Sequence, residues 1–360
     1  MGAFETLEAF LDAEGFWGRA GVEADLYLGY GLAQALRRPP APAPPEPCRL
    51  PLLFCRIRPV ATGRMQAHSL ELRGEWSRSW TDEGYTAAIE SVRAAIARGD
   101  VYQVNLVQHL SAPCNGDAAA LAAALAHLGP LVPRPLVGDG WAIVSASPEL
   151  FLSRRGRRLT TKPIKGTRPE GEDVDDPKDA AEHMMIVDLE RNDLARVCEP
   201  GSIRWPRLME QRRLAGVTHL VSTVEGTLRP DAALAEILAA TFPGGSVTGA
   251  PKLAALEQIA ALEPVGRGAS MGAFGVLRPD GDFELALTIR TFALVGGRLH
   301  LWAGGGIVWD SDPEAEIEES WVKARPLLAA IGALGPPGVG STQPGDERGR
   351  RRRRRRERVP

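Results

Sequence analysis

The chain has 360 residues, of which 44% are hydrophobic and 24% charged, and its formal net charge is −2 at pH 7. This composition describes a globular protein of enzyme size with ample core. No segment has the pattern of a signal peptide or a membrane span, so we expect a cytoplasmic protein. The cysteines have neither metal-site nor redox spacing, which excludes a structural zinc and favours a reducing compartment; they are Cys48, Cys55, Cys114 and Cys198.

The patterning divides the chain into three parts. Residues 1–80 form a short N-terminal region with a Pro-rich loop, 81–334 the main domain, and 335–360 an Arg-rich tail. The tail is expected to be disordered, although an arginine run can also bind nucleic acid or an anionic membrane. No nucleic-acid-binding motif precedes it, so nucleic acid is not the expected partner.

Hydrophobic periodicity and turn residues predict the following elements in chain order. Asp82 is the expected cap of the first long helix. Strands outnumber simple βαβ crossovers, so we expect an α+β fold, a layered β-sandwich with helices packed outside. The expected strands are 50–57, 101–107, 141–145, 150–154, 217–228 and several within 271–307, and the expected helices are 82–99, 118–128, 177–194, 231–242, 253–262 and 313–334.

Lys165 lies in a hairpin-like segment, Thr160 to Pro169, that opens into a Gly-Thr turn. Such a turn holds a side chain at the mouth of a site and leaves backbone N–H groups free for a ligand. A lysine between apolar Ile164 and Gly166 would be desolvated enough to lose its proton and act as a nucleophile. The alternative is a solvated surface lysine.

Two predicted helices each carry a pair of carboxylates three residues apart, which places each pair on one helix face. If both helices converge, they form a site for one hard cation such as Mg²⁺, which prefers carboxylate oxygen. Ordinary solvated helix faces are the alternative reading. The pairs are Asp179 with Glu182 and Glu316 with Glu319, and Lys323 follows one turn later.

Two glycine-rich segments suggest close approach of backbone to a ligand. The loop 243–252 departs from the phosphate-binding Walker pattern, since Ala250 and Pro251 follow its last glycine. It still offers N–H groups and hydroxyls before a helix N-terminus, which suits a carboxylate. Gly304, Gly305 and Gly306 end a strand with no hydrophobic reason for glycine.

Three further polar residues are ambiguous from their local pattern. Arg290 in a strand faces either water or a carboxylate ligand. His219 in a strand is either a hydrogen-bonded core residue or part of a site. Glu149 follows a Pro turn and is a candidate general acid if its pKa is raised.

Taken together, these segments resemble the chorismate-utilising enzymes, the family of anthranilate, aminodeoxychorismate, isochorismate and salicylate synthases. The resemblance runs from about residue 85 to 334. Its motifs are GDVYQVNL (99–106), SPE (147–149), PIKGTR (163–168), EHMMIVDL (182–189), RNDL (191–194), HL (219–220), the loop 243–252, TIR (288–290) and GGGI (304–307).

The resemblance implies a role for each matching residue. Lys165 would attack C2 of chorismate, and Glu149 would protonate the departing C4 hydroxyl. Glu182 and Glu319 would bind Mg²⁺, with Asp179 and Glu316 nearby. The residues expected to hold substrate are Arg290, Lys323, Gly304, Gly305, Gly306, His219, Ser246 and Thr167.

Within this family, lysine at position 165 resembles aminodeoxychorismate synthase component I, whereas anthranilate synthases carry alanine there. Relatives that add water have a lysine base where this chain has Gln103. The implied reaction is amination of chorismate to 4-amino-4-deoxychorismate for para-aminobenzoate and folate synthesis. No cysteine lies in a glutaminase context, so a separate glutamine amidotransferase subunit is expected to supply ammonia. Anthranilate synthase component I and nucleic-acid binding through the tail are the alternatives.

Overall fold

A computed structural model describes residues 2–37, 42–60, 69–169, 177–214 and 217–333. Within them, two antiparallel sheets and the helices on their faces form the α+β layered arrangement that the sequence predicts. No helix of the described part is both long and apolar enough to cross a bilayer. The predicted tail, 335–360, lies outside the described residues.

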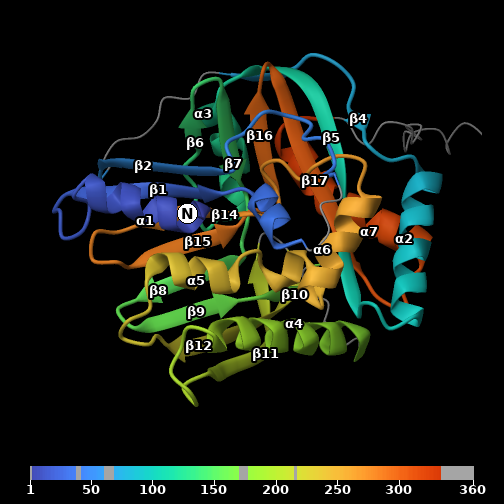
Figure 1. The fold of residues 1–360 in the computed structure, drawn as a ribbon. Helices are drawn as coiled ribbons and strands as arrows, with labels where there is room; N and C mark the ends of the chain where they lie inside the picture. The colour runs from blue at the N-terminus through green and yellow to red at the C-terminus, as the bar shows by residue number, and fades with distance from the viewer. Residues whose placement is uncertain (1, 38–41, 61–68, 170–176, 215–216, 334–360) are drawn as a thin grey trace, which may run out of the picture.

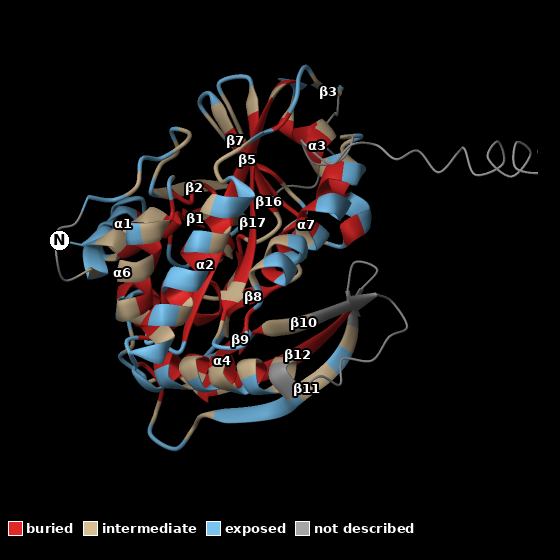
Figure 2. Cartoon of the chain, turned by 90° about the vertical axis from the view of Figure 1, so that its right-hand side faces the viewer, coloured by how far each residue is buried: buried red, intermediate tan, exposed pale blue. Residues whose placement is uncertain are grey.

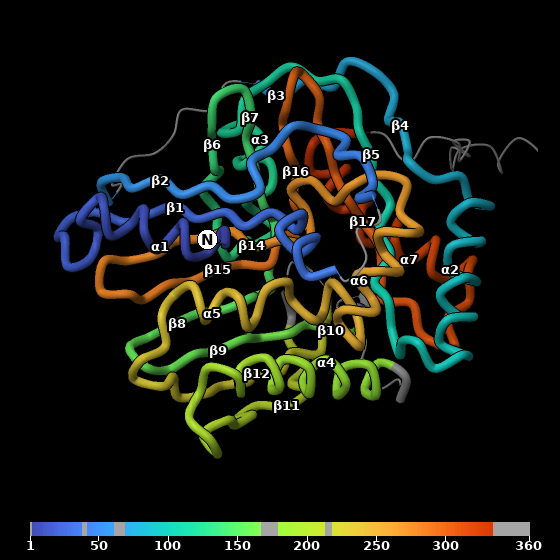
Figure 3. The backbone as a smooth tube through the Cα atoms, viewed as in Figure 1, coloured from blue at the N-terminus to red at the C-terminus, as the bar shows by residue number. Residues whose placement is uncertain are grey.

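Nine strands form the larger sheet: β1 (Val22–Leu28), β2 (Leu53–Pro59), β8 (Leu150–Arg155), β9 (Arg158–Lys162), β10 (Ile164–Pro169), β11 (Arg204–Leu214), β12 (Val217–Thr227), β14 (Ala273–Leu277) and β15 (Phe283–Leu287). Their order is β10-β12-β9-β8-β15-β14-β1-β2, and β11 also pairs with β12. The tube in Figure 3 shows β1 and β2 beside β14 and β15, although they are far apart in the chain. Strands β1 and β2 of the N-terminal region therefore share a sheet with strands of the C-terminal half.

Eight strands form the second sheet: β3 (Leu70–Leu72), β4 (Ser77–Arg78), β5 (Gln103–Gly116), β6 (Leu136–Gly138), β7 (Trp141–Ser145), β13 (Gly249–Ala250), β16 (Thr291–Val295) and β17 (Arg298–Ile307). Their order is β13-β5-β17-β16-β7-β6, with β3 and β4 also paired to β5. The long strand β5 is paired with β17 from Pro113 to Val104. This long pair of strands lies inside the sheet, with other strands paired on both of its sides (Figure 1).

The helices cover the faces and ends of the sheets (Figure 1). Helix α4 packs on β10 and β12, α7 packs on β17 and α2, and α6 packs on β5. Figure 2 shows β11 on the far side of β12, exposed along most of its length. The helices are α1 (Ala3–Ala13), α2 (Asp82–Ala97), α3 (Ala118–Leu125), α4 (Pro177–Ala195), α5 (Leu234–Thr241), α6 (Lys252–Leu262) and α7 (Pro313–Ala330), with short 3₁₀ turns η1 (Tyr30–Leu36), η2 (Ala126–Leu128) and η3 (Gly245–Val247).

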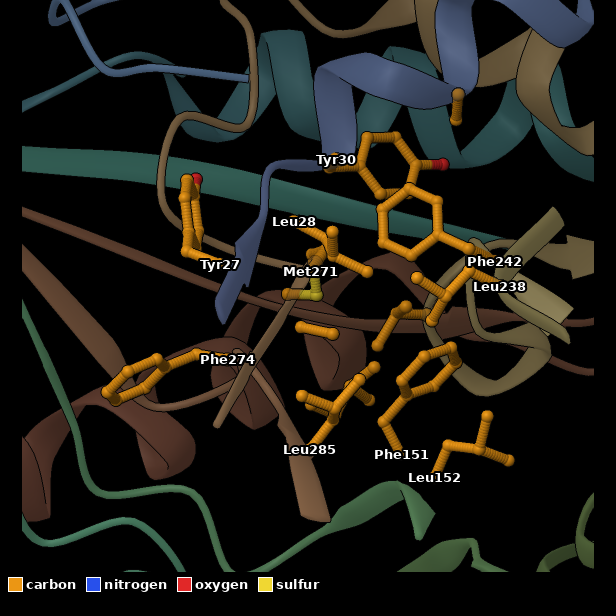
Figure 4. Packing of buried hydrophobic residues seen from close by; sticks show 14 of the residues in the cluster. Tyr27, Leu28, Tyr30, Phe151, Leu152, Leu238, Phe242, Met271, Phe274 and Leu285 are labelled. Atoms are coloured by element: carbon orange, nitrogen blue, oxygen red, sulfur yellow. The ribbon is translucent and has the colours of Figure 1, made fainter. Parts of the chain in front are cut away.

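The main core lies between the sheets and includes side chains from α1, α2, α5 and α6. Figure 4 shows Phe151 of β8, Leu285 of β15, Phe242 after α5 and Leu28 of β1 directed toward one another. A second cluster packs α3 and α7 against the other face of β5, β16 and β17. Burial on both faces explains why most of β5 and β17 is apolar or small.

Two local expectations differ from the structure. Helix α2 is capped by Thr81, whose hydroxyl accepts a hydrogen bond of 3.0 Å from the N–H of Gly84. Asp82 instead lies in the first turn and forms an ion pair with Arg78. Strand β11 was not predicted from the sequence, because its charged residues conceal the strand pattern on a sheet edge exposed to solvent.

We expect Thr81→Ala to lower the free energy of unfolding by about 1 kcal/mol, because the N–H of Gly84 loses its acceptor. Asp82→Asn is the matched control, and an exposed ion pair contributes only a few tenths of a kcal/mol. Urea denaturation of both variants measures the difference. A larger loss for Asp82→Asn than for Thr81→Ala would show that the aspartate is the effective cap.

Candidate active site

Lys165 lies on β10, which is paired with β12 at the edge of the larger sheet. The register of the two strands shifts between Lys165 and Arg168, and Gly166 has a positive φ of 61°. The expected Gly-Thr turn is therefore a bulge within a strand. A bulge re-aims the side chains beside it, and only glycine adopts this φ without strain. Thr167 belongs to the same strand, but its side chain lies outside the described part.

The Lys165 ammonium is paired with the carboxylate of Glu182 on α4. Its Nζ lies 2.6 Å from Glu182 Oε1, and the two side chains are only 13% and 15% exposed. Gln103 Nε2 of β5 donates to the same oxygen at 2.9 Å. Three segments that are distant in the sequence, β10, β5 and α4, thus meet at one carboxylate oxygen. Because Lys165 is largely buried there, it is not a solvated surface lysine.

The charge state of Lys165 differs from the sequence expectation. Burial by itself would lower the pKa of this lysine, but the carboxylates of Glu182, Glu149 and Glu319 together raise it above its ordinary value. Lys165 therefore keeps its proton in this structure, because the Coulomb attraction outweighs the loss of hydration. A nucleophilic role requires that this proton first be transferred.

The glycines of β17 make room for these side chains. A Cβ at Gly306 would lie 2.0 Å from Gln103 Nε2 and 2.8 Å from Glu182 Oε1. A Cβ at Gly305 would lie 3.4 Å from polar atoms of Glu316, Glu319 and Lys323. Polar groups from β5, α4 and α7 thus approach the glycine run closely, which explains why no larger residue occurs there.

Glu149 immediately precedes β8 and is buried, at 5% exposure. Desolvation raises the pKa of its carboxyl to about 7, against the lowering effects of Ser246, Lys165 and Arg290. Its Oε1 accepts a hydrogen bond of 3.0 Å from the Ser246 hydroxyl of η3. A carboxyl that titrates near neutral pH and has a fixed donor suits a general acid.

His219 and Arg290 form one hydrogen-bonded pair beside Lys165. His219 Nδ1 lies 2.8 Å from the carbonyl oxygen of Gly166, and Arg290 Nη2 lies 3.3 Å from His219 Nε2. Desolvation first, and then the charges of Arg290 and Lys323, lower the pKa of His219 to about 4. The imidazole is therefore neutral, with Nδ1–H donating to Gly166 and Nε2 accepting from Arg290.

Arg290 has a left-handed backbone, with φ at 50°. Such a conformation is uncommon for a residue other than glycine and is concentrated at functional sites. Desolvation lowers the pKa of its guanidinium, while Glu149 opposes this shift. Arg290 lies between β15 and β16, not in a strand as the sequence predicts. Its side chain faces the partly buried site rather than bulk water.

The predicted metal ligands are distributed over α4 and α7. Glu316 Oε1 accepts from Ser311 at 2.6 Å, and Glu319 Oε1 lies 2.6 Å from Lys323 Nζ. Asp179 lies one turn before Glu182 and is half-buried. All four are hard oxygen donors of the kind Mg²⁺ prefers. Within the described residues, however, no three acidic, histidine or cysteine side chains gather closely enough to hold a metal ion.

Lys323 connects the α7 group to the rest of the site. Its Nζ donates to the carbonyl oxygen of Gly304 at 3.0 Å. The positive charge of Lys323 contributes to the lowered pKa of His219, and the negative charge of Glu319 contributes to the raised pKa of Lys165. The two groups of predicted residues therefore share one electrostatic environment across the glycine run.

Buried charges behind η3 were not predicted to have a role. Lys252 Nζ lies 2.6 Å from Asp193 Oδ2, and Glu190 is buried one turn before Asp193. Burial, and then the neighbouring Asp193, raise the pKa of Glu190 to about 8. Glu190 and Asp193, three residues apart beside the apolar Leu189 and Leu194, were a usable signal for a buried cluster.

Comparison with known proteins places these residues in a family context. A family model described as "chorismate binding enzyme" matches residues 56–329. Anthranilate synthase component 1 of Streptomyces coelicolor is 39% identical over 316 residues, which cover 83% of this chain and 59% of that protein. Aminodeoxychorismate synthase component 1 of Klebsiella aerogenes is also 39% identical, over 293 residues that cover 78% of this chain and 63% of that protein.

A solved structure supports the same grouping. The crystal structure of anthranilate synthase component I from Streptococcus pneumoniae matches with a TM-score of 0.76 and 28% identity, covering 85% of this chain and 80% of that one. The chain spans about three fifths of the length of the curated relatives it matches, from 59% to 63% for the two named above. The chain is equally identical to an anthranilate synthase component and an aminodeoxychorismate synthase component, so sequence identity does not distinguish the two reactions. The residues of the site must be used to distinguish them.

Glu149→Gln is expected to remove a pH-dependent loss of stability. The ordinary pKa of 4.5 rises to about 7 on folding, so the folded protein retains a proton that the unfolded chain releases. Stability therefore falls as pH rises through this window, and glutamine does not titrate. Relative to the parent, the variant should gain about 1.4 kcal/mol per pH unit, on the order of 3 kcal/mol by pH 8. Urea denaturation at pH 5 and pH 8 measures this gain, and a constant difference would contradict it.

Proposed function

This chain belongs to the chorismate-binding enzyme family, and from that membership we propose that it converts chorismate and ammonia to 4-amino-4-deoxychorismate. The observation that carries the proposal is Lys165 at 2.6 Å from Glu182, inside the site that also contains the buried acid Glu149. The product would serve para-aminobenzoate and folate synthesis.

In the proposed first step, the neutral amine of Lys165 forms a bond to C2 of chorismate. The ring double bonds shift, the C4–O bond breaks, and Glu149 gives its proton to the departing hydroxyl, which leaves as water. Because Lys165 begins protonated, its proton must leave before this bond forms. Glu149 has the complementary property, since burial keeps its proton available near neutral pH.

In the second step, ammonia adds at C4, the double bonds shift back, and the bond between C2 and Lys165 breaks. The proton that ammonia loses restores Glu149, so the net reaction releases one water for each ammonia. Gln103, where water-adding relatives have a lysine, fits this chemistry because ammonia needs no base to become a nucleophile. We further propose that a separate glutamine amidotransferase subunit supplies the ammonia.

Substrate carboxylates would be held by Arg290, Lys323 and the backbone of 304–306, with His219 and Ser246 lining the pocket. Arginine binds a carboxylate through two parallel hydrogen bonds, and its left-handed backbone pre-orients it. Lys323 is already aligned by the carbonyl of Gly304. The neutral His219 supports Arg290 without adding a second positive charge.

We propose Mg²⁺ as the cofactor, held by Glu182 and Glu319 with Asp179 and Glu316 nearby. The donor chemistry supports this assignment, although these carboxylates have lysine and serine partners in this structure. A bound Mg²⁺ supplies positive charge that binds a substrate carboxylate and lowers the affinity of Lys165 for its proton.

Anthranilate formation is the second candidate, because a relative of that name has the same 39% identity as the aminodeoxychorismate synthase relative. That reaction expels pyruvate, whereas the proposed one retains the side chain. Product analysis with chorismate, Mg²⁺ and ammonium, with and without a pyruvate-releasing lyase, distinguishes the two. Pyruvate release without the lyase would favour anthranilate.

Lys165→Ala is expected to reduce formation of 4-amino-4-deoxychorismate by at least about a hundredfold, because the covalent route is lost. Lys162→Ala is the matched control, since this lysine of β9 is exposed and should retain parental activity. Coupled product assays measure both. Normal turnover by Lys165→Ala would disprove the nucleophile assignment, and residual anthranilate would show that the site still activates C2 for ammonia.

Glu319→Gln is expected to weaken the apparent affinity for Mg²⁺ by about tenfold or more, because an amide oxygen is a poorer ligand for a hard cation. Glu318→Gln is the control, since Glu318 neighbours Glu319 but pairs with Arg325 on the exposed side of α7. Magnesium titrations of activity compare the two. A titration of Glu319→Gln that matches the parent would remove Glu319 from the metal site.

A further inference from the structure

A buried ion pair follows α6, outside the residues assigned to chemistry. Glu263 and Arg267 are four residues apart, and their side chains are 1% and 2% exposed. The pair is bidentate, with Arg267 Nε at 2.9 Å from Glu263 Oε2 and Nη2 at 2.7 Å from Oε1. The ring of Tyr30 packs against the guanidinium, whose carbon lies 4.4 Å from the ring centroid.

The pair lies at a fork between β5 and the segment that contains η3. The short strand β13 pairs with β5 at Gly249 and Val104, and one more bond joins Asn105 N to Thr248 O at 3.0 Å. Beyond that point η3 turns away, so the edge of β5 loses its strand partner. Backbone N–H and C=O groups that have no hydrogen-bond partner are costly when buried.

Glu263 and Arg267 bridge this fork. On β5, Arg267 Nη2 donates to the Asn105 carbonyl at 2.7 Å, and Val107 N donates to Glu263 Oε1 at 3.0 Å. On the other branch, Arg267 Nη1 donates to the carbonyl of Val247 at 2.7 Å. One guanidinium therefore ties the η3 segment to the rigid β5 ladder.

The tied segment carries a residue of the site. Val247 directly follows Ser246, whose hydroxyl bonds to Glu149 at 3.0 Å. We propose that Glu263 and Arg267 are positioning residues that hold Ser246 against Glu149, an inference that rests on the proposed role of Glu149 as general acid. Stability alone is a weak reason for such a pair, because apolar residues often replace a buried ion pair without loss.

A double-mutant cycle tests the coupling. Glu263→Gln/Arg267→Met removes both charges together and so leaves no buried charge unpaired. This double substitution is called the pair variant, and its combination with Ser246→Ala the triple variant. Comparing the effect of the pair substitution with and without Ser246→Ala shows whether the ion pair acts through the serine. The readout is chorismate consumption at saturating ammonium, which counts turnover whichever product forms.

We expect the pair variant to lower kcat by about tenfold, the usual effect of losing one well-placed hydrogen bond, and to change KM by less than about threefold. In the Ser246→Ala background the same double substitution should lower kcat by less than about twofold. Equal losses in both backgrounds would overturn the proposal, since the pair would then act independently of Ser246.

A second readout needs no turnover. The Ser246 bond lowers the pKa of Glu149, so its loss should raise that pKa. A pH titration followed by carboxyl ¹³C NMR of glutamate-labelled protein should show a higher Glu149 pKa in the pair variant and in Ser246→Ala. The triple variant should show no further increase over Ser246→Ala. An unchanged Glu149 pKa in the pair variant would refute the inference. A wrong product with the coupling intact would instead refute the proposed reaction alone.

Arg58→Met is the control for general destabilisation. Arg58 Nε is paired with the buried Asp25 Oδ1 at 2.8 Å on β2 and β1, away from η3. This variant should lose stability in urea denaturation comparably to the pair variant but keep parental kcat and Glu149 pKa. A matching loss of kcat in Arg58→Met would show that destabilisation, and not positioning, explains the kinetics.

Discussion

The close ladder between β5 and β17 is the constraint on which the site depends. At Gly304 a Cβ would lie 1.9 Å from the carbonyl oxygen of Leu106, so glycine is required for this approach. The ladder also presents the Gly304 carbonyl to Lys323 and opens space beside Gly306 for Gln103. Side chains from β10, α4 and α7 can therefore converge on backbone that carries no side chains of its own.

Within this frame, two buried groups both have a raised pKa, but for different reasons. Glu149 is buried with a serine donor, and desolvation raises its pKa to about 7. Lys165 is buried among carboxylates, which raise its pKa despite desolvation. Both groups therefore carry a proton near neutral pH, which the proposed reaction requires Glu149 to donate and Lys165 first to lose. The Lys165–Glu182 pair is thus both a structural contact and the point at which the proposed chemistry must begin.

Much of the fold and the site could be predicted from the sequence, because strong periodicity and ordered motifs carry that information. The helices around 82–97 and 313–330 and the assembly of Lys165 with Glu182 are examples. The bulge at Gly166 and the cap at Thr81 were misassigned, since neighbouring residues compete for the same local role. The Glu263–Arg267 bridge was not found, because its partners are backbone groups of distant segments that no local pattern reveals.

The sequence by itself determined the α+β class, the family resemblance and the identity of the side chains that gather at the candidate site, because motifs and periodicity are local properties of the chain. The tertiary structure decided the charge states of Lys165 and Glu149 and the orientation of Arg290 and His219. Those properties depend on desolvation and on charges brought from other elements, and both arise only when distant segments pack together.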